Sequence, residues 1–208
     1  MGINLTAQLS KLDALNSMAS YIGIPPIQNI SEVPLSPDFQ LAELILDEMV
    51  NEVCSHGMPC NTDYKYELTP DGVTGEIAVP AGAISIFPED PNQGYFVERD
   101  GKLYDLDNQT DVFTSPVEVT IYWLYDFESL PQVVRKYLAV ASARRFVSRV
   151  KGDDAVLQTT QLDLLRAETE FLSYSQQIGS VNMIYDNAET SYIIDNNTPN
   201  SGYDYRAY

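Results

Sequence analysis

Apolar residues near the start of the chain recur at helical spacing. At about 100° per residue they fall on one arc of a helical wheel. The residues on this arc are Leu5, Leu9, Leu12, Leu15 and Ala19. The pattern predicts a helix from about Leu5 to Ile22, which Gly23 is placed to end and which Pro25-Pro26 prevents from resuming.

A second amphipathic pattern begins at Ser36-Pro37-Asp38. Serine can cap a helix, proline suits the first helical turn, and aspartate interacts favourably with the positive end of the helix dipole. The apolar face that follows consists of Leu41, Ala42, Ile45, Met49 and Val53. We expect this helix to end near Gly57 and Pro59.

Between about Tyr64 and Leu124 the apolar period shortens to that of β-strands. Pro70-Asp71-Gly72 and Asp100-Gly101 are turn signals between short β-prone runs. One run alternates as a half-buried strand does, with its apolar positions at Val117, Val119, Ile121 and Trp123. The stretch predicts a small antiparallel β domain inserted between two pairs of helices.

Two further helices are predicted after this insertion. The third runs from Pro131 to about Val150, and its apolar residues surround the axis, which is typical of a helix covered on all sides. The fourth begins near Asp153-Asp154 and is expected to end at Gly179. Its apolar stripe consists of Leu157, Leu164, Leu165, Phe171, Leu172 and Ile178.

Together the elements predict an α+β fold, in which a bundle of four main helices carries an inserted antiparallel β domain and an extended C-terminal tail. We place the helical bundle in residues 1–60 and 127–182, the β domain in 61–126 and the tail in 183–208. The tail has too little apolar surface for a core, so we expect a partner to order it. Its tyrosines are Tyr185, Tyr192, Tyr203, Tyr205 and Tyr208.

The composition is strongly acidic. Of 208 residues, 12 are basic and 30 acidic, for a formal net charge of −18, which disfavours nonspecific binding of nucleic acid. No apolar run approaches the roughly 18 residues that a membrane helix needs, so we expect no membrane insertion. The chain begins without a signal-peptide pattern, and its two cysteines are too few for a disulfide framework; we expect synthesis in a reducing cytoplasm.

The third predicted helix reverses this charge. Between Ser129 and Gly152 there is no acidic residue and there are six basic ones, so the segment is +6 and the rest of the chain −24. The six are Arg135, Lys136, Arg144, Arg145, Arg149 and Lys151.

Three interpretations of this basic segment are open: ion pairs within the fold, contact with the acidic face of an identical neighbour, and binding of phosphate. Acids suited to internal pairing include Asp47, Glu52, Glu168 and Glu170. For the second interpretation, the candidate subunit-interface residues are Arg135, Arg144, Arg145 and Arg149.

Two segments resemble metal sites only in part. Cys54–Cys60 contains the single histidine, His56, and both cysteines, but its spacing differs from that of zinc knuckles, and we interpret it as a helix end. Asp105–Asp111 resembles half a calcium loop, but Pro116 stands where the loop requires glutamate, and we interpret it as a polar turn. We therefore assign no metal, cofactor or catalytic residue, although carboxylate pairs for glycoside cleavage remain open.

Five groups of segments carry a family resemblance. They are Leu15–Met18 with Ile22–Pro26, Tyr95–Asp105 with Thr110–Phe113, Asp126–Pro131, Ala141–Phe146, and Asn182-Met183. In order and local pattern, they resemble the tail tubular protein A family, the adaptor or gatekeeper proteins of short-tailed bacteriophages. The resemblance extends over nearly the whole chain to Met183.

This resemblance implies a structural protein of the virion tail, without enzymatic activity, that is assembled in the host cytoplasm. It implies a homo-oligomeric ring, normally of twelve copies, between the portal protein above and the nozzle, tail tubular protein B, below. Genome DNA would pass through the lumen without specific binding, the tyrosine-rich tail would dock on the portal, and the β domain would face the nozzle. A tail fibre is a further candidate partner. The alternative is a tail-associated glycan hydrolase acting on host surface polysaccharide.

Overall fold

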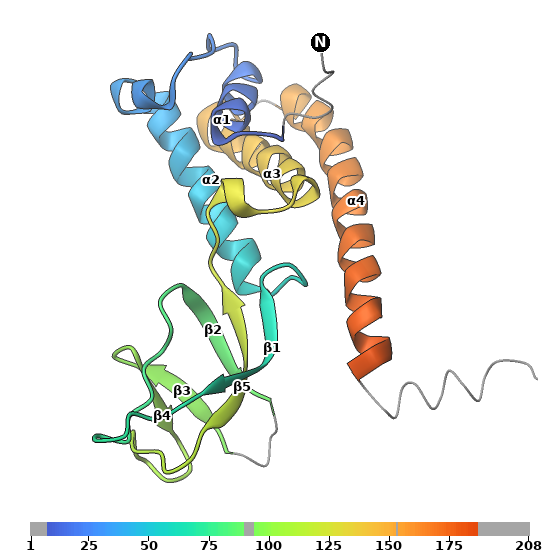
Figure 1. Ribbon diagram of the computed structural model, residues 1–208. Coiled ribbons are helices and arrows are strands. Elements are labelled where there is room, and N and C mark those ends of the chain that lie inside the picture. Colours follow the sequence, from blue (N-terminus) through green and yellow to red (C-terminus); the bar gives the residue numbers. More distant parts are fainter. Residues whose placement is uncertain (1–7, 90–93, 153, 187–208) are drawn as a thin grey trace, which may run out of the picture.

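The computed structural model describes residues 8–89, 94–152 and 154–186; of residues 154–159 and 179–186 it describes the backbone alone. Helices α1, α2 and α3 gather at one end and the strands at the other, α4 extends from the helical end to the level of the sheet, and β1 and β5 lead from one end to the other (Figure 1). This arrangement confirms the predicted α+β class. None of the helices in the described ranges combines the length and apolar character that a membrane span requires.

Among the described residues, the helical end contains four main helices and two short 3-10 helices. They are α1 (Lys11–Ser20), η1 (Ile30–Leu35), α2 (Pro37–Ser55), η3 (Phe127–Ser129), α3 (Gln132–Val150) and α4 (Asp154–Asp186). The start of α2 at Pro37 and the extent of α3 agree with the sequence pattern. The central helix is α3, which contacts α1, α2 and α4.

The first helix begins later than predicted, because a local cap fixes its start. The Asp13 backbone N–H donates to Ser10 Oγ at 3.1 Å, and the Ser10 backbone N–H donates to Asp13 Oδ2 at 3.1 Å. This reciprocal capping box satisfies helix-end donors and makes Lys11 the first helical residue. The predicted start at Leu5 was therefore wrong for residues 8–10, and Leu5 itself lies outside the described residues.

The fourth helix ends later than predicted. It continues through Gly179 and reaches Asp186. An isolated glycine inside a helix costs about 1 kcal/mol relative to alanine, which is too little to end a long helix by itself. The predicted end at Gly179 was therefore wrong.

Strands β1 (Thr62–Leu68), β5 (Val117–Trp123) and β2 (Ala83–Pro88) form an antiparallel sheet in the order β1-β5-β2. Strands β3 (Phe96–Arg99) and β4 (Lys102–Asp105) form a separate hairpin. The alternation predicted for β5 is confirmed, because its apolar positions up to Ile121 are buried. The predicted hairpin turn is confirmed at Asp100-Gly101, where both residues have positive φ.

Two separate hydrophobic cores underlie the two ends. The largest fully buried side chains of the helical core include Leu15, Phe39, Ile45, Leu138 and Phe146. The core of the β part includes Ile77, Leu103, Val119 and Ile121. Separate cores support the division into helical and β domains predicted above, which stays a proposal.

Asn61 joins the two parts. Its side chain is 1% exposed. The Asn61 amide donates to the carbonyls of Cys54 at 2.9 Å and Trp123 at 2.8 Å, and its Oδ1 accepts from the Met58 N–H at 2.6 Å. One buried amide thus ties the end of α2 to the end of β5, and the hydrogen bonds that it makes offset the cost of burying it.

Candidate functional site

Two arginines of α3 form ion pairs with α2. Arg145 Nη2 lies 2.8 Å from Glu52 Oε2, and Arg149 Nη2 lies 2.9 Å from Glu48 Oε2. The first pair confirms an internal partner expected from the sequence. Glu48, the partner of Arg149, was not among the acids expected from the sequence. Which of the 30 acidic residues an arginine reaches depends on how the two helices cross.

The opposite side of α3 faces α4. Lys136 Nζ lies 2.6 Å from Glu170 Oε2, and Arg144 Nη1 donates to Gln161 Oε1 at 2.8 Å. Internal pairing is thereby confirmed for Lys136 with Glu170. Each pair is partly exposed, so its net contribution to stability is about 0–1 kcal/mol.

Arg135 is buried within the subunit, with 6% of its surface exposed. Its guanidinium donates to the carbonyls of Leu130 at 2.6 Å and Leu9 at 3.1 Å, to Gln8 Oε1 at 2.9 Å, and to the Glu128 carbonyl. The guanidinium of Arg135 therefore connects the turn before α3 to the segment before α1 through hydrogen bonds. Of the four candidate interface arginines, this one has a structural role inside the monomer.

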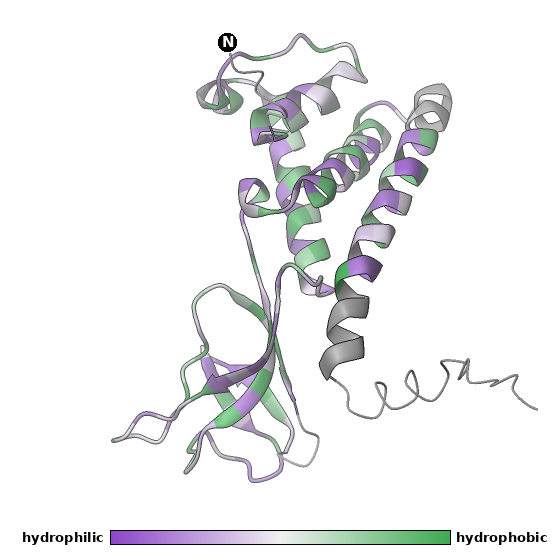
Figure 2. Cartoon of the chain, turned by 45° about the vertical axis from the view of Figure 1, so that its right-hand side comes forward, coloured by the Kyte–Doolittle hydropathy of each residue, from purple (hydrophilic) through white to green (hydrophobic). Residues whose placement is uncertain are grey.

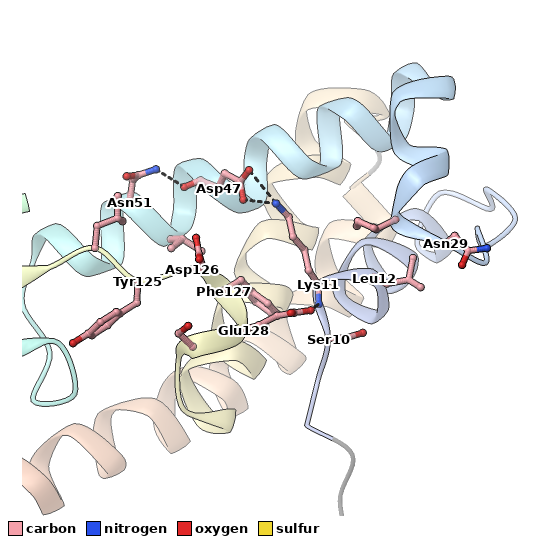
Figure 3. Close-up of a pocket in the computed structure, with 14 residues that line it drawn as sticks. Ser10, Lys11, Leu12, Asn29, Asp47, Asn51, Tyr125, Asp126, Phe127 and Glu128 are labelled. Carbon is pink, nitrogen blue, oxygen red and sulfur yellow. Dashed lines mark hydrogen bonds and ion pairs between the residues drawn. The ribbon is translucent and has the colours of Figure 1, made fainter. Parts of the chain in front are cut away.

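An open groove of about 870 Å³ lies between α1, α2 and the segment after β5. Lys11 reaches across it to Asp47, as Figure 3 shows. The Lys11 ammonium lies 2.9 Å from Glu43 Oε1 and 3.0 Å from Asp47 Oδ1. Burial lowers the pKa of Lys11, but the hydrogen bonds and charges of these two acids outweigh it, so that the pKa is raised above its usual value.

Two carboxylates of this groove hold helices together. Asp47 pairs with Lys11, as above, although the sequence pointed to α3 for its partner. The Lys11 backbone N–H donates to Glu128 Oε1 at 3.2 Å, which connects the start of α1 to η3. These two acids therefore connect structural elements of the subunit. In a glycosidase, by contrast, a pair of carboxylates flanks the scissile bond.

The segment around His56 is a helix end, as interpreted from the sequence. His56 caps α2, and its Nδ1 lies 2.6 Å from the Glu52 carbonyl oxygen. Burial raises the pKa of the Cys54 and Cys60 thiols. Within the part of the chain that the structure describes, no three His, Cys, Asp or Glu side chains gather as a metal ion would require.

The polar turn predicted at Asp105 is also confirmed. Asp105 Oδ1 accepts from the backbone N–H of Asp107 at 2.8 Å and of Asn108 at 3.0 Å. Asn108 Nδ2 donates to Asp105 Oδ2 at 2.8 Å. These hydrogen bonds, those to Asn108 above all, hold the pKa of the Asp105 carboxyl below its usual value. Asp105 therefore closes the turn after β4.

The candidate portal-docking tyrosines fall where side chains are not described. The backbone of Tyr185 belongs to the last turn of α4. Outside the described residues lie Tyr192, Tyr203, Tyr205 and Tyr208. Their proposed role therefore stays a prediction.

Comparison with known proteins gives two consistent matches. A family model described as "Tail tubular protein" matches residues 12–181, which includes both the helical and the β part. The tail tubular protein A of Klebsiella phage KP34 is 30% identical over 146 residues, which cover 70% of this chain and 76% of that protein. The resemblance seen in the sequence is confirmed: the chain belongs to the tail tubular protein family and is a structural component of the phage tail.

Proposed function

We propose that the chain forms the adaptor ring that joins the portal to the tail nozzle, tail tubular protein B, and that surrounds part of the DNA-ejection channel. The ring contains twelve copies. The observation that carries this proposal is the distribution of charge: the chain has a net charge of −18, and three of the five basic residues of α3 pair with acids of the same subunit.

The excess of acidic residues matters for the passage of DNA. Three basic residues of α3 pair with acids of the same chain, and Arg135 is buried. Because the net charge of the subunit is −18, its field is negative, and a ring of such subunits repels phosphate along its lumen. Few contacts between cations and phosphates then have to break as DNA moves, which keeps friction low.

The two-ended shape suits an adaptor. Three of the main helices lie at one end of the subunit and the strands at the other, while α4 extends from the helical end toward the level of the sheet (Figure 1), so that two different partners can be bound at once. In this arrangement the helical end and the tyrosine-rich tail face the portal, and the β domain faces the nozzle. Tyrosine suits the docking tail, because it offers a large contact area with only two side-chain torsions to fix.

Neighbouring subunits contact each other head to tail, since a closed ring requires one patch to meet a different patch next door. The side chains of Arg145 and Arg149 remain 33% and 44% exposed in their ion pairs. Together with Arg144, they are proposed to contact the acidic face of a neighbour as well as their own partners. Arg135 takes no part, because it is buried.

Electron microscopy of the purified chain mixed with purified portal tests the function. We expect rings of the chain stacked coaxially on portal rings, with an open central channel. Particles that show bare portals at every ratio of the two proteins would overturn the proposal. Release of reducing ends from capsular polysaccharide or peptidoglycan by the same preparation would instead favour the glycan hydrolase.

A further inference from the structure

A second groove, of about 380 Å³, opens where the last turns of α2 face α3 and α4. This volume lies in the range of about 300–1,000 Å³ in which proteins hold small ligands. Figure 2 shows apolar positions mixed with polar ones along α2 and α4. The apolar residues that line this α2–α4 groove are Met49, Val53, Met58, Tyr137 and Phe171.

Helix α4 forms one wall of the α2–α4 groove. The ring of Phe171 stacks on that of Tyr137, with 4.7 Å between centroids, whereas the next residue, Leu172, is 51% exposed. The apolar stripe predicted for α4 is therefore divided between the groove and the outer surface. Ser175 lines the groove and is half-buried. Ser173 is exposed, about 200° away from Ser175 around the helix.

The chemistry of the lining favours an apolar occupant. Two methionines and two stacked aromatic rings offer an adaptable apolar surface. The acidic residue in the lining, Glu52, pairs with Arg145 at 2.8 Å. The rim therefore does not present an unpaired carboxylate to an incoming acidic chain segment.

The sequence after α4 contains one run of three apolar residues, Tyr192–Ile194. It is preceded by Asn187–Ser191, which has no large apolar side chain, and it is followed by Asp195. All of these residues lie outside the described ranges. Their order places a short apolar segment a few residues beyond the last turn of α4.

The length of chain before this run matches the distance back to the groove. Helix α4 continues past the end of α2 toward the level of the sheet (Figure 1). From Ser175 to its end at Asp186 there are eleven residues, which span about 16 Å at 1.5 Å per residue. Six extended residues beyond Asp186 span about 20 Å. Tyr192 is therefore the first large apolar residue after α4 that can return to the level of Ser175.

We propose that Tyr192–Ile194 occupies the α2–α4 groove of its own subunit until the portal binds. A short tether gives a segment an effective concentration in the millimolar range, so that weak apolar contacts suffice to hold it. The contact in the free subunit is independent of the adaptor role. Its release rests on the proposed function, in which the tail docks on the portal.

Cysteine crosslinking of the full chain tests the contact. Ser175→Cys places a thiol in the groove, and Ser191→Cys places one directly before the apolar run, which stays intact. The matched control combines Ser191→Cys with Ser173→Cys, at an exposed position of the same helix. Glutathione disulfide is the oxidant, and mass spectrometry of peptides identifies the joined cysteines, the native Cys54 and Cys60 included.

We expect the groove pair to crosslink within one chain at least about tenfold faster than the control pair, since a disulfide requires Cα atoms within about 7 Å. Tyr192→Ser, Ile193→Ser and Ile194→Ser together should remove this difference, because they delete the apolar contact and keep the tether. Purified portal should slow crosslinking of the groove pair at least about tenfold.

Equal rates for the two pairs, or a difference that the three serine substitutions leave unchanged, would overturn the contact. Crosslinks that join two chains would overturn it as well, since another copy would then supply the occupant. Undiminished crosslinking in chains stacked on portal would overturn the release. An absence of stacking would overturn the release together with the adaptor function, while crosslinking of the free chain still decides the contact.

Discussion

Gly57 lies directly against the ring of Tyr122, where the helical part meets the sheet. A Cβ added at Gly57 would lie 2.5 Å from Cε2 and 2.7 Å from Cε1 of that ring, closer than such atoms approach. Gly57 also has a φ of +72°. The close approach and the left-handed backbone both require glycine at this junction.

Gly57→Ala should lower the free energy of unfolding by about 2–4 kcal/mol, which combines left-handed strain with a clash against Tyr122. Gly23→Ala is the matched control, because Gly23 has a φ of +79° and open space where its Cβ would lie. It should cost only about 1–2 kcal/mol. Urea unfolding measures both. Equal losses at the two sites would mean that the ring of Tyr122 moves aside without cost.

The sequence predicted the position of a helix start or a turn correctly where a few adjacent residues determine it. Pro37 at the start of α2 and Asp100-Gly101 in the hairpin are such residues, and the structure has the helix and the turn there. The start of α1 was missed, because the capping pair Ser10 and Asp13 lies inside an apolar period that continues through it. Periodicity reports which face is apolar, but capping decides where a helix begins.

The partners of the basic residues were only partly predictable. Glu52 and Glu170 were expected, whereas Glu48 was not, and Asp47 binds Lys11. Ion pairs between helices depend on crossing angle and axial offset, which no short-range pattern records. The burial of Arg135 was missed for the same reason, since the carbonyls that it binds come from two separate turns.

Arg135→Met should destabilise the chain by about 2–4 kcal/mol, because it leaves buried carbonyls without their charged donor. Arg135→Lys should recover only part of this loss, since a lysine lacks the fork that reaches several acceptors. Thermal and urea unfolding provide the measurement. As a control, Arg149→Met removes an exposed pair and should cost about 0–1 kcal/mol. A loss for Arg135→Met as small as that of the control would contradict the role assigned to Arg135.

Acid should weaken the turn after β4. The pKa of folded Asp105 is below the usual 3.8, so its contribution to stability is complete above the unfolded pKa and is lost as pH falls through the folded one. Asp105→Asn should therefore show a smaller loss of stability between about pH 5 and pH 2 than the unmodified chain. Asp100→Asn removes a charge from the neighbouring hairpin turn and serves as control. Parallel pH profiles for Asp105→Asn and the unmodified chain would contradict the assignment.

Ending the chain after Met183 should leave a folded subunit that no longer joins portals, because it removes all five tyrosines of the proposed docking tail. Unfolding temperature and co-sedimentation with portal measure the two properties. A second truncation after Asp186 keeps all of α4 and therefore Tyr185. Binding by the second truncation alone would assign docking to the last helical turn, and binding by both would contradict a docking role of the tail.

Exchanging the charges of Arg149 and Glu48 separates contacts within a subunit from contacts between subunits. The two side chains are 44% and 40% exposed, so Arg149→Glu alone should cost about 1 kcal/mol of stability, through loss of the pair and like-charge repulsion. Adding Glu48→Arg restores an ion pair inside the monomer and should recover this stability. If Arg149 also contacts an acidic neighbour, as proposed, the exchanged chain should still form rings poorly, since the outer charge remains reversed. Urea unfolding measures stability, and electron microscopy counts rings. If the exchanged chain recovers both stability and ring formation, Arg149 and Glu48 interact only within their own subunit.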